Sequence, residues 1–508
     1  MISPRAACAA AALALSASFL APAAALSPAG PDRAGADLLG EASLMSAVRE
    51  YAGLGDHHRT GTAAERRTQA WLTRGLRSAG LRVGSDAYTF AGFLPRTVAL
   101  SVGGAPVAGP AAYLYSGLTR ARGITAELVD VGSGSAAQVS SADVAGRIAV
   151  VTVPVVNGLT VGLPGAFRAV DEAGAAGLVV VTDGPDGLVV HQNVDSRAGV
   201  QDLPTLLVGS DAGAEVVAAA GERATLTLTA RVGQSCDTDV WGVLPGADPD
   251  RYLVIGTPTS AHVSSGSERG AGVAVLLGLA RHYASLPRSE RPVGLVFAGL
   301  SGHEIGFLGL PVLLAAHESW FARADAYLHL GASIATRALA STSDLPVGEP
   351  TRSLYVSENP VLEAVATASF LGSQPLSTTP PSVLNPGEQS VAYAAGIPII
   401  GISGSGDYFH TAGDTPDVVV PSLLVGQAVS YSAAIDSLAT LPAGLVRSAN
   451  ALALQAAQQA EAPEPADTER GGRQPQPVRS CVDRRPTQSP LGVQGRIVGK
   501  SRVYRPGA

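Results

Sequence analysis

Residues 252–256 read Tyr-Leu-Val-Ile-Gly, a short apolar run that ends in glycine. Similar runs follow at 293–298, 326–330 and 397–402, and residues 270–283 between the first two have the composition of a buried helix. Buried apolar strands that alternate with helices are typical of a mostly parallel sheet with helices on both faces. The sequence therefore predicts a mixed α/β fold.

The composition indicates folded domains and argues against a nucleic-acid-binding protein. The chain has 508 residues, of which 46% are apolar and 15% charged, which is enough for two or three domains with buried cores. The net charge is −7, yet residues 470–508 carry nine basic residues and one acid. This basic segment is rich in Pro, Gln and Gly, so we expect a solvated extension and no nucleic-acid partner.

The first 25 residues have the pattern of a secretory signal peptide. Arg5 precedes an Ala-rich apolar run, and small residues at 23–25 suit cleavage. A retained membrane anchor is the weaker alternative, because Ser and Pro interrupt the run. No later stretch has about 18 uninterrupted apolar residues, so we expect a secreted chain without a transmembrane segment after cleavage.

After cleavage two cysteines remain, Cys236 and Cys481. In an exported chain such a pair favours a disulfide, which would hold the basic segment against the body of the protein. Two free thiols are the alternative.

The composition of the sequence divides the rest of the chain into four parts. Residues 26–92 and 236–442 are expected to form the main domain, and residues 93–235, with short Val/Ile/Leu strands between Gly, Ser, Asp and Pro, a β-rich insert. Residues 443–508 are expected to form a helix, a Pro-rich linker and the basic tail. His191, alone in a loop of the insert, is expected at the surface.

Chemically competent side chains follow three of the predicted strands: Glu268, the pair His303-Glu304, and His410. Ligands of such sheets bind beyond the carboxyl ends of the strands. Two carboxylates and one imidazole are a plausible zinc set with a fourth position open to water. His303 would then be the candidate general base.

Each of these residues also has a purely structural explanation. A Glu at a helix start complements the helix dipole, His410 can hold a turn, and Asp414 can cap the helix that follows. Arg269, next to Glu268, could also form an ion pair with that carboxylate in the place where a metal would sit.

Two stretches carry a resemblance to a known family. Residues 408–417, Tyr-Phe-His-Thr-Ala-Gly-Asp-Thr-Pro-Asp, resemble the last metal-histidine motif of the secreted zinc aminopeptidases, whose relatives include glutamate carboxypeptidases and glutaminyl cyclases. Residues 240–256 resemble the strands that lead into the first metal loop of that family. Within the insert, residues 143–151, Asp-Val-Ala-Gly-Arg-Ile-Ala-Val-Val, resemble a protease-associated (PA) domain.

The resemblance implies a metal site that is partly lost. Glu268, Glu304 and His410 correspond to one zinc of the family's pair, and His303 stands where the family has its base Glu. The His-x-Asp motif of the second zinc is replaced by residues 257–260, Thr-Pro-Thr-Ser. Candidates for substitute ligands, or for residues that surround the ligands, are His329, His262, Arg269, Asp414 and Glu388.

Two functions are compatible with this pattern, and both allow one zinc ion at most. The first is a non-catalytic protein that binds a peptide or small amide in the cleft that corresponds to the family's active site. The second is an active single-zinc metallohydrolase, an aminopeptidase or amide-processing enzyme, that uses His303 as base.

Overall fold

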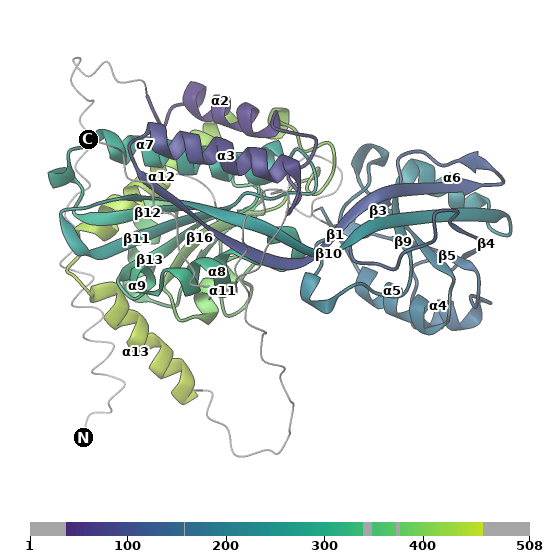
Figure 1. Cartoon of the computed structure of the whole chain (residues 1–508). Helices are drawn as coiled ribbons and strands as arrows, with labels where there is room; N and C mark the ends of the chain where they lie inside the picture. The colour runs from purple at the N-terminus through teal and green to yellow at the C-terminus, as the bar shows by residue number, and fades with distance from the viewer. Residues whose placement is uncertain (1–36, 157, 339–347, 372–375, 461–508) are drawn as a thin grey trace, which may run out of the picture. The chain divides into compact units, whose positions relative to one another are not determined.

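The computed structural model describes residues 37–156, 158–338, 348–371 and 376–460 (Figure 1). The predicted signal peptide, the Pro-rich linker, Cys481 and the basic tail lie outside these described residues. Cys236 lies in a strand of the described part, and its pairing with Cys481 stays a prediction.

The main domain is built around the larger part of a mixed sheet. In spatial order its strands are β15 (Ser377–Thr379), β14 (Arg352–Val356), β16 (Ile399–Gly404), β13 (Ala324–Leu330), β11 (Asp248–Pro258), β12 (Val293–Leu300) and β10 (Arg223–Leu244). Strand β11 is parallel to β12 and β13, and β13 is parallel to β16. Strand β10 is antiparallel to β12, and β14 is antiparallel to β16. The carboxyl ends of four strands therefore meet at one edge.

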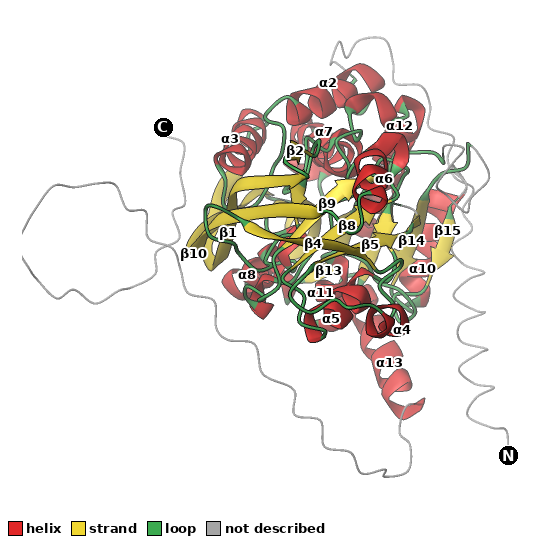
Figure 2. Ribbon diagram, turned by 90° about the vertical axis from the view of Figure 1, so that its right-hand side faces the viewer, coloured by secondary structure: helices red, strands yellow, loops and turns green. Residues whose placement is uncertain are grey.

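Helices cover both faces of this sheet (Figures 1 and 2). One face carries α2 (Glu41–Ala52), α3 (Ala63–Ser78), α7 (Ala271–Ser285), α10 (Pro360–Ala366) and α12 (Pro421–Thr440), and the other carries α8 (Gly309–Ala316), α9 (Glu318–Phe321) and α11 (Gln389–Ala394). Leu253 and Ile255 of β11 belong to the core on the first face, and Val254 belongs to the core on the second. Because alternate residues of a strand point to opposite faces, the whole strand is apolar. The predicted α/β architecture is confirmed.

The insert contains the remaining part of this sheet. Its strands are β4 (Ile124–Asp130), β5 (Ile148–Val153), β8 (Gly177–Thr182), β9 (Thr205–Gly209) and β3 (Ala111–Ala112), and its helices are α4 (Ala136–Ser141), α5 (Leu163–Glu172) and α6 (Ser210–Ala218). Strands β4, β5, β8 and β9 are parallel to one another, and β3 is antiparallel to β9. Three short strands complete the described chain: β2 (Ala105–Pro106), β6 (Val155–Val156) and β7 (Leu159–Thr160).

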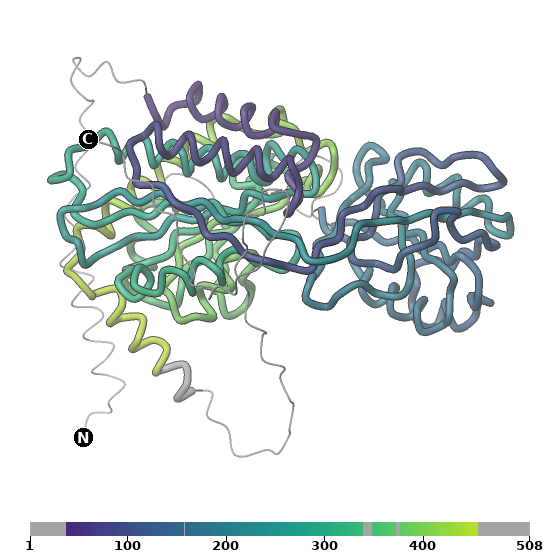
Figure 3. The backbone as a smooth tube through the Cα atoms, in the orientation of Figure 1, coloured from purple at the N-terminus to yellow at the C-terminus, as the bar shows by residue number. Residues whose placement is uncertain are grey.

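Two long strands belong to both the main domain and the insert. Strand β1 (Arg82–Val102) pairs antiparallel with β10 from Arg82↔Val243 to Val102↔Ala224, as the tube in Figure 3 shows. The same β10 pairs with β12 of the main domain at one end and with β4 of the insert at the other. The connection is therefore a hydrogen-bonded ribbon of two strands.

Among the described helices, no single one has the length and apolar character needed to cross a membrane. Helix α12 and the first part of α13 (Leu445–Ala460), which meet at 94°, pass the length and composition test only when they are taken together.

A buried ion cluster ties the last helix to the sheet. The side chain of Asp325, 1% exposed at the start of β13, accepts hydrogen bonds from Arg251 Nε and Nη2 at 2.9 and 2.7 Å. Its other oxygen lies 2.9 Å from Nη1 of Arg447 on α13. Both guanidiniums therefore depend on this one carboxylate for their charge balance.

We expect Asp325→Asn to lower the free energy of unfolding by about 3–5 kcal/mol, because it leaves buried charge without a counter-ion. Chemical denaturation at neutral pH measures the effect. The matched control is Asp250→Asn, since Asp250 forms a longer ion pair of 3.4 Å with Arg323 and its side chain is 82% exposed. The control should change stability by less than about 0.5 kcal/mol, and an equal loss in both variants would contradict the prediction.

Candidate functional site

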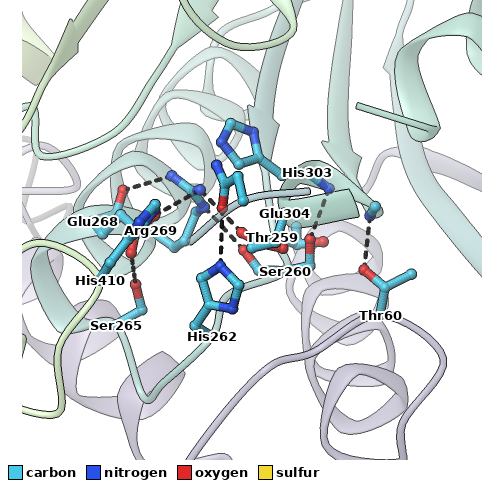
Figure 4. A network of polar contacts seen from close by, with 12 residues as sticks. Thr60, Thr259, Ser260, His262, Ser265, Glu268, Arg269, His303, Glu304 and His410 are labelled. Atoms are coloured by element: carbon cyan, nitrogen blue, oxygen red, sulfur yellow. Dashed lines mark hydrogen bonds and ion pairs between the residues drawn. The ribbon is translucent and has the colours of Figure 1, made fainter. Parts of the chain in front are cut away.

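The predicted site residues lie where three strands end. The loop after β11 leads to Glu268 and Arg269, the loop after β12 carries His303 and Glu304, and the loop after β16 carries His410. Because β12, β11 and β16 are parallel, with only β13 between β11 and β16, their loops converge at one edge of the sheet. The structure brings Glu268, Glu304 and His410 together (Figure 4).

The centre of this cluster is the guanidinium of Arg269. Its Nη2 lies 2.7 Å from Glu268 Oε1 and 3.0 Å from Glu304 Oε1, and its Nε donates to the carbonyl oxygen of Ser260 at 2.9 Å. The Arg269 side chain is fully buried. Burial alone would lower the pKa of Arg269, but the two carboxylates raise it, so the group stays charged. A permanent cation therefore sits between the two acids.

His410 completes the cluster on the side of Glu268. Its Nδ1 donates to the carbonyl oxygen of His191 at 3.0 Å, and its Nε2 lies 3.2 Å from Glu268 Oε1. Burial opposes ionisation of Glu268, yet Arg269 and His410 lower its pKa from 4.5 to about 2. Glu268 is therefore a carboxylate at neutral pH.

A short π-helical turn, Gly266–Gly270, presents Glu268 and Arg269. Asp414 accepts hydrogen bonds from the backbone N–H groups of Ser267 and Glu268, both at 2.9 Å, and from the hydroxyl of Ser265 at 3.2 Å. Burial, with repulsion from Glu268, raises the pKa of Asp414 to about 7. Asp414 thus holds the turn in place and does not face the guanidinium.

The backbone at this cluster is strained. Ser265 and His410 have φ values of +56° and +61°, in the left-handed region that residues with a Cβ rarely adopt. Such conformations cost about 1–3 kcal/mol each and persist where the surrounding structure imposes them. The two strained residues lie in the loops that carry Glu268 and His410.

His262 points toward the insert. Its Nε2 lies 2.9 Å from Asn193 Oδ1, and its ring stacks on His191 with centroids 5.2 Å apart. Its ring also meets that of His410 edge-on at 5.1 Å. His191, which was expected at the surface, is half-buried, and its ring and its carbonyl oxygen both contact the cluster. No local sequence signal marks His191 or Asn193, since their role depends on the insert's fold.

A second polar cluster contains His303, Glu388 and His329. His303 Nδ1 lies 2.9 and 3.0 Å from the two oxygens of Glu388, which is fully buried. Burial opposes ionisation of Glu388, yet His303 lowers its pKa to about 2. A Cβ at Gly387 would lie 3.3 Å from His329 Nε2 and 3.6 Å from His303 Cε1, and the Gly387 φ of +73° also disfavours a residue with a side chain. His303 is thus engaged with Glu388.

These contacts decide whether the residues present fit a zinc ion. Zinc would need Glu268, Glu304 and His410 at about 2.0–2.2 Å from one point. Nη2 of Arg269 already lies between the two carboxylates. Within the described part of the chain, no group of three His, Cys, Asp or Glu side chains is arranged to hold a metal ion. The arrangement does not fit zinc.

Comparisons with known proteins give the fold. No family model and no curated protein matches the sequence. Among solved structures, a zinc aminopeptidase from Bacillus subtilis aligns over 78% of this chain and 94% of its own, with a TM-score of 0.63 and 19% identity. A peptidase M28 precursor from Shewanella amazonensis aligns over 80% and 97%, with a TM-score of 0.62 and 19% identity.

An aminopeptidase from an Aneurinibacillus species aligns over 80% of this chain and 95% of its own, with a TM-score of 0.53 and 19% identity. At this level of identity the likeness concerns the backbone and not the chemistry. The chain has the fold of the zinc aminopeptidases.

Proposed function

We propose that this chain is a secreted, non-catalytic binding protein on the zinc aminopeptidase fold, in which the guanidinium of Arg269 stands in place of the metal. One observation carries the proposal: Arg269 Nη2 lies 2.7 and 3.0 Å from the two carboxylates that the family resemblance assigns to zinc. Secretion rests on the signal-peptide pattern of residues 1–25.

Charge balance supports this assignment. Glu268 and Glu304 are buried, and buried carboxylates need a counter-charge. A zinc ion would supply it in an aminopeptidase, and Arg269 supplies it here. Zinc could enter only if the guanidinium left the two carboxylates. The displaced guanidinium would then be a buried charge without a counter-ion.

A second candidate function is a single-zinc hydrolase with His303 as base. The observation in its favour is the contact between His303 and the buried Glu388, because an imidazole oriented by a carboxylate is typical of general bases. This function requires Arg269 to vacate the site, so the binding function is the one we prefer. Metal analysis separates the two.

The wild-type protein, dialysed against zinc and then passed over a desalting column, should retain less than about 0.1 equivalent of zinc. It should also fail to hydrolyse aminoacyl p-nitroanilides. Atomic emission and an absorbance assay measure the two results. One equivalent of retained zinc, together with chelator-sensitive hydrolysis, would overturn the proposal.

Removal of the guanidinium should restore metal binding. In the absence of metal, Arg269→Ala should lose about 3–5 kcal/mol of stability, because two buried carboxylates lose their counter-charge. Zinc should then raise the thermal midpoint of Arg269→Ala and leave that of the wild type unchanged. Arg269→Ala combined with Glu268→Gln is the matched control and should lose the response to zinc.

The depressed pKa of Glu268 predicts a specific loss of stability in acid. The ionised form of Glu268 is favoured in the folded state, so its contribution is present above pH 4.5 and disappears as the pH falls toward 2. At pH 7 we expect Glu268→Gln to be less stable than the wild type by about 3 kcal/mol. Denaturation at pH 7, 4 and 2.5 should show this difference shrinking, and a constant difference would refute the assignment.

A further inference from the structure

A cavity of about 440 Å³ opens beside the Arg269 cluster. It is lined by ten of the residues between Asp56 and Arg67, before α3 and in its first turns, by Phe90, Phe93, Leu94 and Pro95 of β1, and by Leu114, Tyr115 and Arg231. Glu304 and Ile305 form its boundary with the cluster. A cavity of this size is in the range of small-ligand sites.

Four arginines line this cavity: Arg59, Arg66, Arg67 and Arg231. Among the described residues, none of the four forms an ion pair with an acid within 4.0 Å; the ion pairs found there involve other arginines. The lining contains only two acids, the exposed Asp56 and Glu304. The cavity therefore has an excess of positive charge.

Arg59 carries the clearest sign of a missing anion. Its Nε is buried and has no hydrogen-bond acceptor within the described chain. Burial lowers the pKa of Arg59, and the carboxylate of Asp56 offsets only part of that effect. The N-terminal end of the 16-residue helix α3 faces the same space and adds to its positive potential.

One part of the wall is apolar and held in place. Phe90, Phe93, Leu94 and Ile305 line it. The hydroxyl of Tyr115 donates to the carbonyl oxygen of Ala91, and the Tyr115 ring lies 5.4 Å from that of Phe93. These contacts fix an aromatic part of the cavity wall.

A free acceptor marks the end of the cavity near the cluster. Glu304 Oε1 is bound by Arg269, but its buried Oε2 has no hydrogen-bond partner among the described residues. Glu304 is 2% exposed, so a ligand in the cavity is the available donor. The cavity thus offers positive charge, an apolar wall and one carboxylate oxygen.

We infer that this cavity binds a short peptide with a free C-terminal carboxylate. The carboxylate pairs with Arg59 and Arg231, an apolar side chain packs on Phe93 and Tyr115, and the amino group lies toward Glu304. Guanidinium groups suit this task because they bind carboxylates in bidentate fashion. The inference deepens the proposed function and rests on it, since an uncleaved ligand requires a non-catalytic site.

Calorimetry with the tripeptide Gly-Leu-Phe tests the inference on the full-length protein. We expect binding that weakens at least tenfold for the C-terminal amide of the same peptide, because the amide removes the charge that the arginines contact. Arg231→Gln and Arg59→Gln should each weaken binding of the free acid at least tenfold. Arg231 is exposed, so its variant should fold even if Arg59→Gln does not.

Arg74→Gln is the matched control. Arg74 is an exposed arginine of the same helix α3 that does not line the cavity, and its variant should bind Gly-Leu-Phe as the wild type does. Equal binding of acid and amide, or full binding by Arg231→Gln, would overturn the inference. Competition by inorganic phosphate at the same concentration as the peptide would also overturn it, because it would indicate a simple anion site.

The outcomes separate this inference from the proposed function. Absence of peptide binding in a protein that neither retains zinc nor hydrolyses substrates contradicts only the inference. Chelator-sensitive cleavage of Gly-Leu-Phe contradicts the proposed function as well.

Discussion

The structure at the centre of this protein depends on one buried cation. Arg269 holds two carboxylates that arrive from different strands, and its Nε reaches the carbonyl oxygen that follows β11. A metal ion would bind the same acids reversibly, with an affinity that changes with pH and metal supply. A guanidinium is covalently part of the chain and stays protonated at any physiological pH. The site is therefore assembled by folding alone.

This exchange of cations changes what the site can do. Open zinc sites activate water, because the metal carries a free coordination position and lowers the pKa of bound water. A guanidinium has only N–H donors, and Arg269 donates to Glu304 and to the carbonyl oxygen of Ser260 and forms an ion pair with Glu268. What the structure shows beside this site is a cavity whose wall contains apolar side chains and charged groups. The binding function proposed above needs only these features.

Much of the fold and part of the candidate site can be predicted from the sequence, for different physical reasons. Apolar strands such as residues 252–256 are recognisable because both faces of the sheet are buried, and the convergence of Glu268, Glu304 and His410 follows from parallel strand order. The adjacency of Glu268 and Arg269 raised an ion pair as an alternative to zinc. Which cation fills the space depends on the side-chain direction in the π-helical turn, and sequence periodicity does not encode this direction. The contacts of His191 and Asn193 could not be predicted because both lie in a loop of the insert, whose position depends on the insert's fold.

The ribbon of β1 and β10 has a consequence for the cavity. Its two strands stay hydrogen-bonded from the pair Arg82 and Val243 to the pair Val102 and Ala224, with one register shift between Pro95 and Thr97. The cavity takes wall residues from this ribbon, Phe90, Phe93 and Arg231, and from the insert beyond it, Tyr115. The two sides of the cavity are therefore joined by backbone hydrogen bonds of one ribbon and not by a single loop.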